Sequence, residues 1–181
     1  MAKSAGKYFT ETSLGNSYVI NTAAAGVAIP ISTGVALTIG LWNTSTTKNA
    51  VLLYASAGYT SGTIAIGDFG IVNQFVGFNT GTGAPLAAIT AGAPKNLLLG
   101  AGKSSAMTAF PATATLTTGG TAAMWLGRSN EIATAAPGVS VMYHDFDGTL
   151  IVTPGQVVAL CGSVAQTGLF TCSIAWSEVD I

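Results

Sequence analysis

The sequence predicts an all-β fold, a sandwich or a barrel, in a single domain. About ten short segments rich in β-branched and apolar residues follow one another, with turn residues about every 8–12 positions. This spacing is typical of all-β sandwiches and barrels. No long segment has the 3.6-residue period of an amphipathic helix. Residues 1–15 are expected to form a short N-terminal arm, and residues 16–181 the β-domain.

The first part of the domain carries the clearest strand pattern. From Val35 to Leu41, branched apolar residues alternate with small or polar ones, which predicts a strand with one buried face. The polar run 43–49 then predicts a turn. Strands are expected over 17–22, 28–31, 35–42, 50–56 and 62–66.

The segment 68–111 is expected to be a long loop or insertion within the domain. Its Gly- and Pro-rich stretches at 81–85 and 92–94 are typical of loops, and loops of this length usually carry function or contacts. Strands are expected again over 112–117, 122–126, 139–143, 149–152, 156–164 and 169–179.

The last two strands are predicted to form a hairpin. With its turn at 165–168, Cys161 would lie opposite Cys172. Alternate residues of the final strand are large and apolar, so this face should lie in the core; they are Phe170, Cys172, Ile174 and Trp176. Glu178 and Asp180 at its end are expected to form a charged edge that blocks sheet-to-sheet aggregation.

The chain carries few charges. Only 13 of its 181 residues are charged, or 7%, whereas 49% are hydrophobic. Ala, Thr, Gly and Ser number 29, 24, 23 and 14, so half of the chain is small residues. Such hydrophobicity excludes intrinsic disorder. A net charge of −1 without a basic region argues against a nucleic-acid partner.

No membrane segment is expected either. The uncharged run 12–47 is broken by Gly, Pro and Asn, so it offers no stretch of about 18 apolar residues. The first residues lack the apolar stretch of a signal peptide. A soluble monomer of this size normally carries charges over its whole exterior. The exterior is therefore expected to be neutral, covered by other subunits, or both.

Cys161 and Cys172 are expected to be buried thiols. Free Cys is among the most buried residue types, and nothing in the sequence directs the chain to an oxidising compartment. A disulfide between them is the alternative. Two cysteines and one histidine, His144, supply too few ligands for a structural zinc site, and no cofactor is expected.

Catalysis is not expected. A nucleophilic triad would have to use His144 as its base, and no Gly-x-Ser-x-Gly motif is present. Asp145 and Asp147 in Asp-x-Asp-Gly look like a fragment of a Ca²⁺ loop, but the further carboxylates of such a loop are missing. A turn is therefore predicted there, with a weak ion site as the alternative.

The N-terminal arm contains the candidates for contacts with a capsid or with another subunit. They are Lys3, Lys7, Tyr8 and Phe9. One interpretation is an arm that becomes ordered on a neighbouring subunit. The alternative is a mobile tail.

Several short motifs resemble those of bacteriophage virion proteins. They are Leu41-Trp42-Asn43 before a Ser/Thr turn, the segments 48–53 and 58–63, Asp147–Gly155 leading into the penultimate strand, and Trp-Ser-Glu-Val in the final strand. On these motifs, over roughly residues 35–66 and 147–181, the chain resembles the trimeric β-jelly-roll head decoration (cement) proteins of tailed bacteriophages and related fibre heads.

The resemblance implies a jelly-roll-like antiparallel β-sandwich that forms a homotrimer. Such a protein is assembled in the host cytoplasm, binds the major capsid protein on the outer surface of the virion and clamps neighbouring capsomers. It has no active site and no cofactor. Contacts with sister subunits and with the shell would account for the scarcity of charge.

Three other functions compete with capsid decoration. A trimeric fibre head or adhesin would recognise a host surface glycan with exposed aromatic residues, for which Trp42 and Trp125 are candidates, although core packing is expected of both. A capsid shell protein that packages nucleic acid is disfavoured by the absence of a basic arm. A hydrolase is the weakest alternative.

Overall fold

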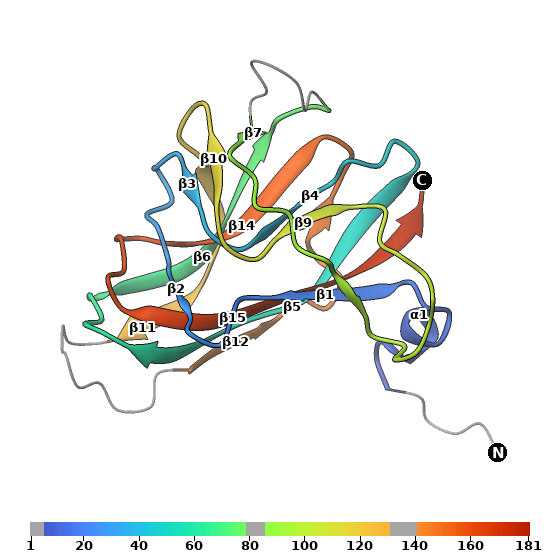
Figure 1. The fold of residues 1–181 in the computed structure, drawn as a ribbon, viewed down its shortest axis with the longest axis horizontal. Helices are drawn as coiled ribbons and strands as arrows, with labels where there is room; N and C mark the ends of the chain where they lie inside the picture. The colour runs from blue at the N-terminus through green and yellow to red at the C-terminus, as the bar shows by residue number, and fades with distance from the viewer. Residues whose placement is uncertain (1–5, 79–85, 131–140) are drawn as a thin grey trace.

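The structure is a computed structural model of the chain, and it describes residues 6–78, 86–130 and 141–181. It is an all-β sandwich, as predicted, in which a five-residue helix, α1 (Phe9–Ser13), precedes antiparallel strands in three sheets (Figure 1). Among the described residues, no helix is long and apolar enough to cross a membrane.

The three sheets lie in layers, with the second sheet in the middle (Figure 1). The first sheet has the order β12 (Val141–Asp145), β5 (Lys48–Ser61), β15 (Leu169–Asp180), β1 (Ser17–Asn21) and β8 (Lys95–Asn96), with β13 (Ile151–Val152) beside β5 and β2 (Val27–Ala28) beside β15. The second has the order β11 (Thr121–Asn130), β6 (Gly67–Phe75), β14 (Gln156–Gly162), β4 (Gly40–Trp42) and β9 (Thr108–Phe110). The third has the order β3 (Ala36–Leu37), β10 (Ala114–Leu116) and β7 (Leu86–Ala87).

Eight of these strands define the topology of the sandwich. Numbered one to eight in chain order, they are β1, β4, β5, β6, β11, β12, β14 and β15. The first sheet then reads six, three, eight, one, and the second reads five, four, seven, two. Most connections therefore cross from one sheet to the other.

The main core fills the space between the first and second sheets. The predicted inward face of β15 is confirmed, because Phe170, Cys172, Ile174 and Trp176 are all buried in this core. Tyr18 of β1 stacks on Trp176 with ring centroids 6.0 Å apart. On β6, Phe69 contacts Phe170 edge to face at 5.2 Å.

A second core lies between the second and third sheets. On β14, Val158 and Leu160 enter the main core, whereas Val157, Ala159 and Cys161 enter the second one. The middle sheet is thus buried on both faces where these two cores overlap. A strand in such a position reads as an almost continuous apolar run, as 157–161 does.

The predicted hairpin between the last two strands is wrong. β14 pairs with β4 and β6, whereas β15 pairs with β1, β2 and β5. The two strands lie in different sheets because the apolar residues on each are buried against the sheet opposite. The connection between them is anchored by Gln166, whose buried side chain accepts a hydrogen bond from the Ala65 backbone N–H at 3.0 Å.

The prediction of a long loop over 68–111 is also wrong for its first part. Residues 67–75 form β6, which lies between β11 and β14 in the middle sheet. Phe69 and Ile71 face the main core and Val72 faces the second one. Residues 79–85 lie outside the described part of the chain. After them come only the short strands β7, β8 and β9.

Candidate functional site

The end of the sandwich beside α1 brings together residues that the sequence singled out for two different reasons. Lys7 comes from the predicted contact arm, and Asp145 and Asp147 from the possible ion site. Lys7 Nζ lies 2.7 Å from Asp147 Oδ1 and 3.0 Å from Asp145 Oδ2. The Asp-x-Asp-Gly motif therefore binds an ammonium group of its own chain.

The motif forms a turn, as its residue types predict. β12 ends at Asp145, and the Asp147 backbone N–H donates to Asp145 Oδ1 at 2.9 Å. Asp147 and Gly148 both adopt positive φ, 51° and 73°, a conformation that Asp tolerates and Gly adopts readily. Among residues 6–78, 86–130 and 141–181, no three His, Cys, Asp or Glu side chains are grouped so as to hold a metal ion.

The electrostatics of this contact follow from its donors. The Tyr8 hydroxyl, the Lys7 ammonium and the Asp147 backbone N–H all donate to Asp145, and they lower the pKa of its carboxyl to about 2. The pKa of the Lys7 ammonium is raised, mainly by its hydrogen bond to Asp147 and also by its contact with Asp145. Both groups remain solvated, so the ion pair orients the segment more than it stabilises the fold.

Tyr8 fixes the N-terminal segment against the outer face of the first sheet. Its ring packs on Val19, Leu53 and Ala175, and burial raises the pKa of its hydroxyl. The hydroxyl lies 3.3 Å from the Leu53 carbonyl oxygen. That carbonyl lies at a register shift between β5 and β15, where one extra residue of β5 is unpaired with β15.

The predicted contact residues of the arm therefore have different environments. Lys7 and Tyr8 contact their own chain rather than projecting toward a neighbour. Phe9, on α1, is 59% exposed and remains available for an external contact. Lys3 lies outside the described residues.

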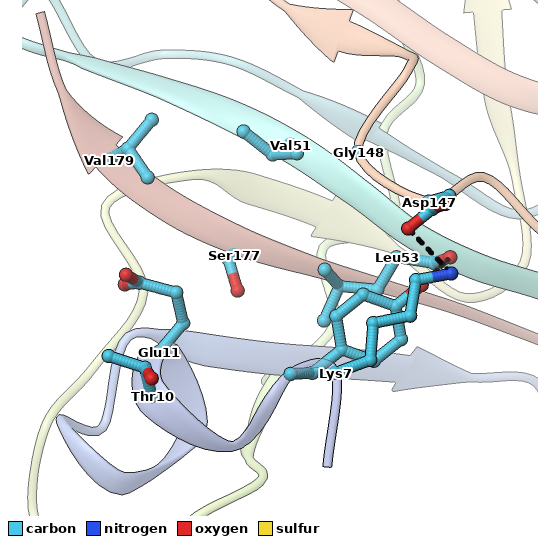
Figure 2. Close-up of a pocket in the computed structure, with 10 residues that line it drawn as sticks. Lys7, Thr10, Glu11, Val51, Leu53, Asp147, Gly148, Ser177 and Val179 are labelled. Carbon is cyan, nitrogen blue, oxygen red and sulfur yellow. Dashed lines mark hydrogen bonds and ion pairs between the residues drawn. The ribbon is translucent and has the colours of Figure 1, made fainter. Parts of the chain in front are cut away.

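A pocket of about 330 Å³ lies between the N-terminal segment and the first sheet (Figure 2). Its floor is apolar and consists of Val51 and Leu53 from β5 and Val179 from β15. Lys7 and Glu11 line its rim (Figure 2). Both rim groups already have partners, since Lys7 binds the two aspartates and Glu11 accepts a hydrogen bond from the Asn16 side chain at 3.1 Å.

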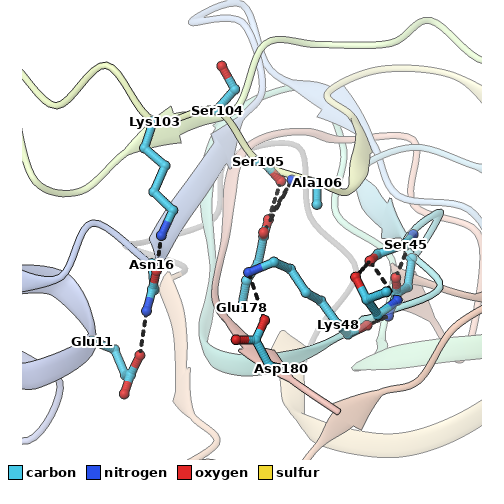
Figure 3. Close-up of polar contacts among 12 residues, drawn as sticks. Glu11, Asn16, Ser45, Lys48, Lys103, Ser104, Ser105, Ala106, Glu178 and Asp180 are labelled. Atoms are coloured by element: carbon cyan, nitrogen blue, oxygen red, sulfur yellow. Dashed lines mark hydrogen bonds and ion pairs between the residues drawn. The ribbon is translucent and has the colours of Figure 1, made fainter.

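The same end of the molecule holds a buried carboxylate, Glu178, which was expected on a charged edge. β15 is not an edge strand, because β5 and β1 flank it, and Glu178 is only 3% exposed. Its Oε1 accepts hydrogen bonds from Ser105 Oγ at 2.5 Å and from the Ala106 N–H at 3.0 Å (Figure 3). Glu178 thereby anchors the loop before β9. Asp180 is exposed and pairs with Lys48 at 3.2 Å.

Most of the described charged residues gather at this end. Besides the groups above, Lys103 binds the side chain of Asn16 (Figure 3), and Lys95 precedes Asn96, which donates to the Gly15 carbonyl. Within the described ranges, only Asp68 and Arg128 lie elsewhere. The third sheet and its flanking segments, 31–37, 86–92 and 111–120, contain no charged residue at all.

Large apolar side chains are also exposed on several elements. The most exposed of them are Phe9, Leu14, Phe75, Leu99, Val141, Tyr143 and Ile181. Leu99, in the loop after β8, is 87% exposed.

The structure separates the two tryptophans proposed for glycan recognition. Trp42 is buried in the second core, and its indole N–H donates to the Gly77 carbonyl at 3.0 Å. Trp125, on β11, is 48% exposed. Sequence periodicity did not distinguish them, because the exposure of Trp125 depends on irregular pairing between β11 and β6.

The remaining candidate residues are part of the packing. His144 lies against Phe146, with ring centroids 4.9 Å apart. Cys161 and Cys172 are free buried thiols in different cores, and burial raises the pKa of each to about 12. Comparison of the chain with protein-family models, with curated proteins and with solved structures finds no match.

Proposed function

We propose that this protein is a structural virion protein that binds the outer surface of a bacteriophage capsid as a homotrimer and stabilises contacts between capsomers. The observation that carries the proposal is the distribution of charge. Nine of the 11 described charged residues, all but Asp68 and Arg128, lie at the end beside α1. Apart from Asp68 and Arg128, the rest of the described surface carries no charged side chain.

A neutral surface suits permanent assembly, because its burial desolvates few charges. Apolar area contributes about 25 cal/mol for each Å² removed from water, and a standard interface buries about 800 Å² on each partner. A closed trimer buries two different patches on every subunit. Contacts with the major capsid protein would bury a third patch on each subunit. Coverage of this extent accounts for solubility with so few exposed charges.

The strand order supports the same proposal. A first sheet of strands one, eight, three and six and a second of two, seven, four and five supports a jelly-roll arrangement of the sandwich. Jelly rolls are common in viral capsid proteins, but they also occur in lectins. The fold is therefore compatible with decoration, and the argument for it rests on the surface.

We assign no enzymatic role to the candidate residues. Cys161 and Cys172 are buried with raised pKa values, the opposite of an activated nucleophile. Asp145 and Asp147 are occupied by Lys7. The proposal needs no cofactor, nucleic acid or membrane.

Cryo-electron microscopy of virions that carry this protein tests the proposal. We expect trimeric density in many copies over the outer shell, centred on three-fold or quasi-three-fold positions. Particles stripped of the protein should regain that density when the purified protein is added. Density restricted to the tail, or none on the shell, would contradict decoration.

A trimeric fibre head or adhesin is the second candidate. The observation that favours it is the half-exposed indole of Trp125. In the same micrographs a fibre head would occur in a few copies at the tail. The two candidates therefore give opposite results.

A further inference from the structure

The indole of Trp125 is exposed on one side and packs on a glycine of the neighbouring strand on the other. Its indole lies over Gly70, its cross-strand neighbour on β6. A Cβ added to Gly70 would lie 2.7 Å from Cε3 of the indole and 2.7 Å from the Met124 carbonyl oxygen. Any larger residue at position 70 would therefore displace the ring. Glycine at position 70 leaves room for the indole, which is 48% exposed.

Strand irregularities place the indole in this position. The pairing of β11 with β6 shifts register three times, and one shift falls between Trp125 and Gly127. Gly127 has φ 142°, which favours glycine, and an added Cβ there would meet nothing within 4 Å. Bulges commonly redirect a side chain near a functional site.

The third sheet ends before it reaches the indole. Val72, two residues along the same face of β6, is buried beneath Gly120 and Leu116. Gly70 is the next position on that face. The indole thus occupies the border between a covered part and an open part of the middle sheet.

Asp68 and Arg128, the two described charged residues that do not lie at the α1 end, are on the same two strands as Gly70 and Trp125. Asp68 lies on the same face of β6, two residues before Gly70 and about 7 Å from it along the strand. Arg128 pairs with Asp68 in the strand register, and Arg128 Nε lies 3.8 Å from Asp68 Oδ1. The side chain of Arg128 is 61% exposed and that of Asp68 is 43% exposed. Such a long, open ion pair leaves most donor and acceptor positions free.

We propose that Trp125, Asp68 and Arg128 form a binding site for a neutral pyranose sugar. The apolar C–H face of the sugar ring packs on the exposed indole, which offers a large rigid surface. Asp68 accepts hydrogen bonds from ring hydroxyls, and Arg128 donates to hydroxyl oxygens. One carboxylate and one guanidinium leave the site without net charge, which favours a neutral sugar over a sialylated or sulfated one.

The site is shallow, so one sugar binds weakly. Repetition over the subunits of a trimer, and over many trimers on a particle, would convert weak binding into firm attachment to a glycan-coated surface. The proposal does not depend on the position of the protein in the virion. Its test uses the purified protein in solution and can fail while capsid decoration holds.

Tryptophan fluorescence isolates the site, because Trp42 and Trp176 are buried and only Trp125 is accessible to a quencher. Acrylamide quenching is measured with oligosaccharides of glucose, galactose and N-acetylglucosamine as probes. We expect at least one neutral probe to protect Trp125 from quenching, whereas sialyllactose does not. Equal quenching with and without every neutral probe would overturn the proposal.

The contribution of each residue is then tested in variants, whose affinity for the protecting sugar is measured by saturation-transfer NMR. Trp125→Ala should weaken binding about tenfold, the value of one aromatic contact, and Trp125→Phe by less. Asp68→Asn and Arg128→Gln should each weaken it as well. Tyr143→Ala, which removes an exposed aromatic side chain from the other sheet, is the matched control. Equal affinity of Trp125→Ala and Tyr143→Ala would overturn the assignment.

Discussion

At the scale of single residues, Asp145 determines how the N-terminal segment responds to pH. The folded-state pKa, about 2, lies below the unfolded value of about 3.9. The ionised carboxylate therefore favours docking at pH values above about 4, and this contribution is lost as the pH falls through about 2. We expect the NMR signals of the Tyr8 ring to move to undocked positions over this interval.

The Lys7→Gln variant provides the control for that titration. It replaces the ammonium group with a neutral amide, so the carboxyl should titrate at a higher pH than in the wild-type protein, while the Tyr8 hydroxyl and the Asp147 N–H still lower its pKa. Titration of wild-type Asp145 at its usual pKa, with no coupled change at Tyr8, would show that the contact does not form in solution.

The two cysteines give a second prediction at this scale. Burial raises the pKa of Cys161 and of Cys172 to about 12, so almost no thiolate exists at pH 8. We expect iodoacetamide to modify neither residue in the native protein and both after unfolding, as counted by mass spectrometry. Rapid modification of the native protein, or the mass deficit of a disulfide, would contradict this arrangement.

At the scale of elements, Glu178 connects β15 to the loop before β9. Its buried carboxylate accepts from Ser105 and Ala106. Hydrogen bonds to a buried charged group contribute about 1.5–3 kcal/mol, so Glu178→Ala should lower the free energy of unfolding by about 2–3 kcal/mol. Denaturant titration measures this loss, and faster hydrogen exchange at the Ala106 amide should accompany it.

Asp180→Ala is the matched control, since it removes a carboxylate two residues away on the same strand. Asp180 is exposed, and its ion pair with Lys48 should contribute at most about 1 kcal/mol. If the two variants lose the same stability, Glu178 does not anchor the loop.

The strands differ in how well the sequence predicted their buried faces and their partners. Alternation in β15 predicted its buried face, because that strand has the core on only one side over most of its length. β14 was assigned the wrong partner, since a strand buried on both faces has no alternation to fix its neighbours. β6 was missed because Gly67, Asp68 and Gly70 disfavour strand by composition, although Gly70 accommodates the indole of Trp125.

The candidate site was predicted only in its parts. The sequence indicated Lys7 and Tyr8 as contact residues and Asp145 and Asp147 as a turn. The contact between them could not be predicted, because Lys7 and Asp145 are 138 residues apart in the sequence. It depends on where the N-terminal segment crosses the first sheet. The buried role of Glu178 was missed for the same reason, as its donors, Ser105 and Ala106, lie 73 and 72 residues earlier in the chain.

At the scale of the whole molecule, the distribution of charge is the main guide to function. A chain with 7% charged residues and most of them at one end leaves broad neutral surfaces and several exposed apolar side chains. Burial of such surfaces against protein desolvates few charges. The proposed function therefore requires that the purified protein not remain a monomer.

Light scattering coupled to size-exclusion chromatography tests this requirement most directly. We expect a mass about three times the 18.1 kDa of one chain, unchanged on dilution to low micromolar concentration and in high salt, because few charges lie in the contacts. A stable monomer of 18.1 kDa under the same conditions would contradict the account.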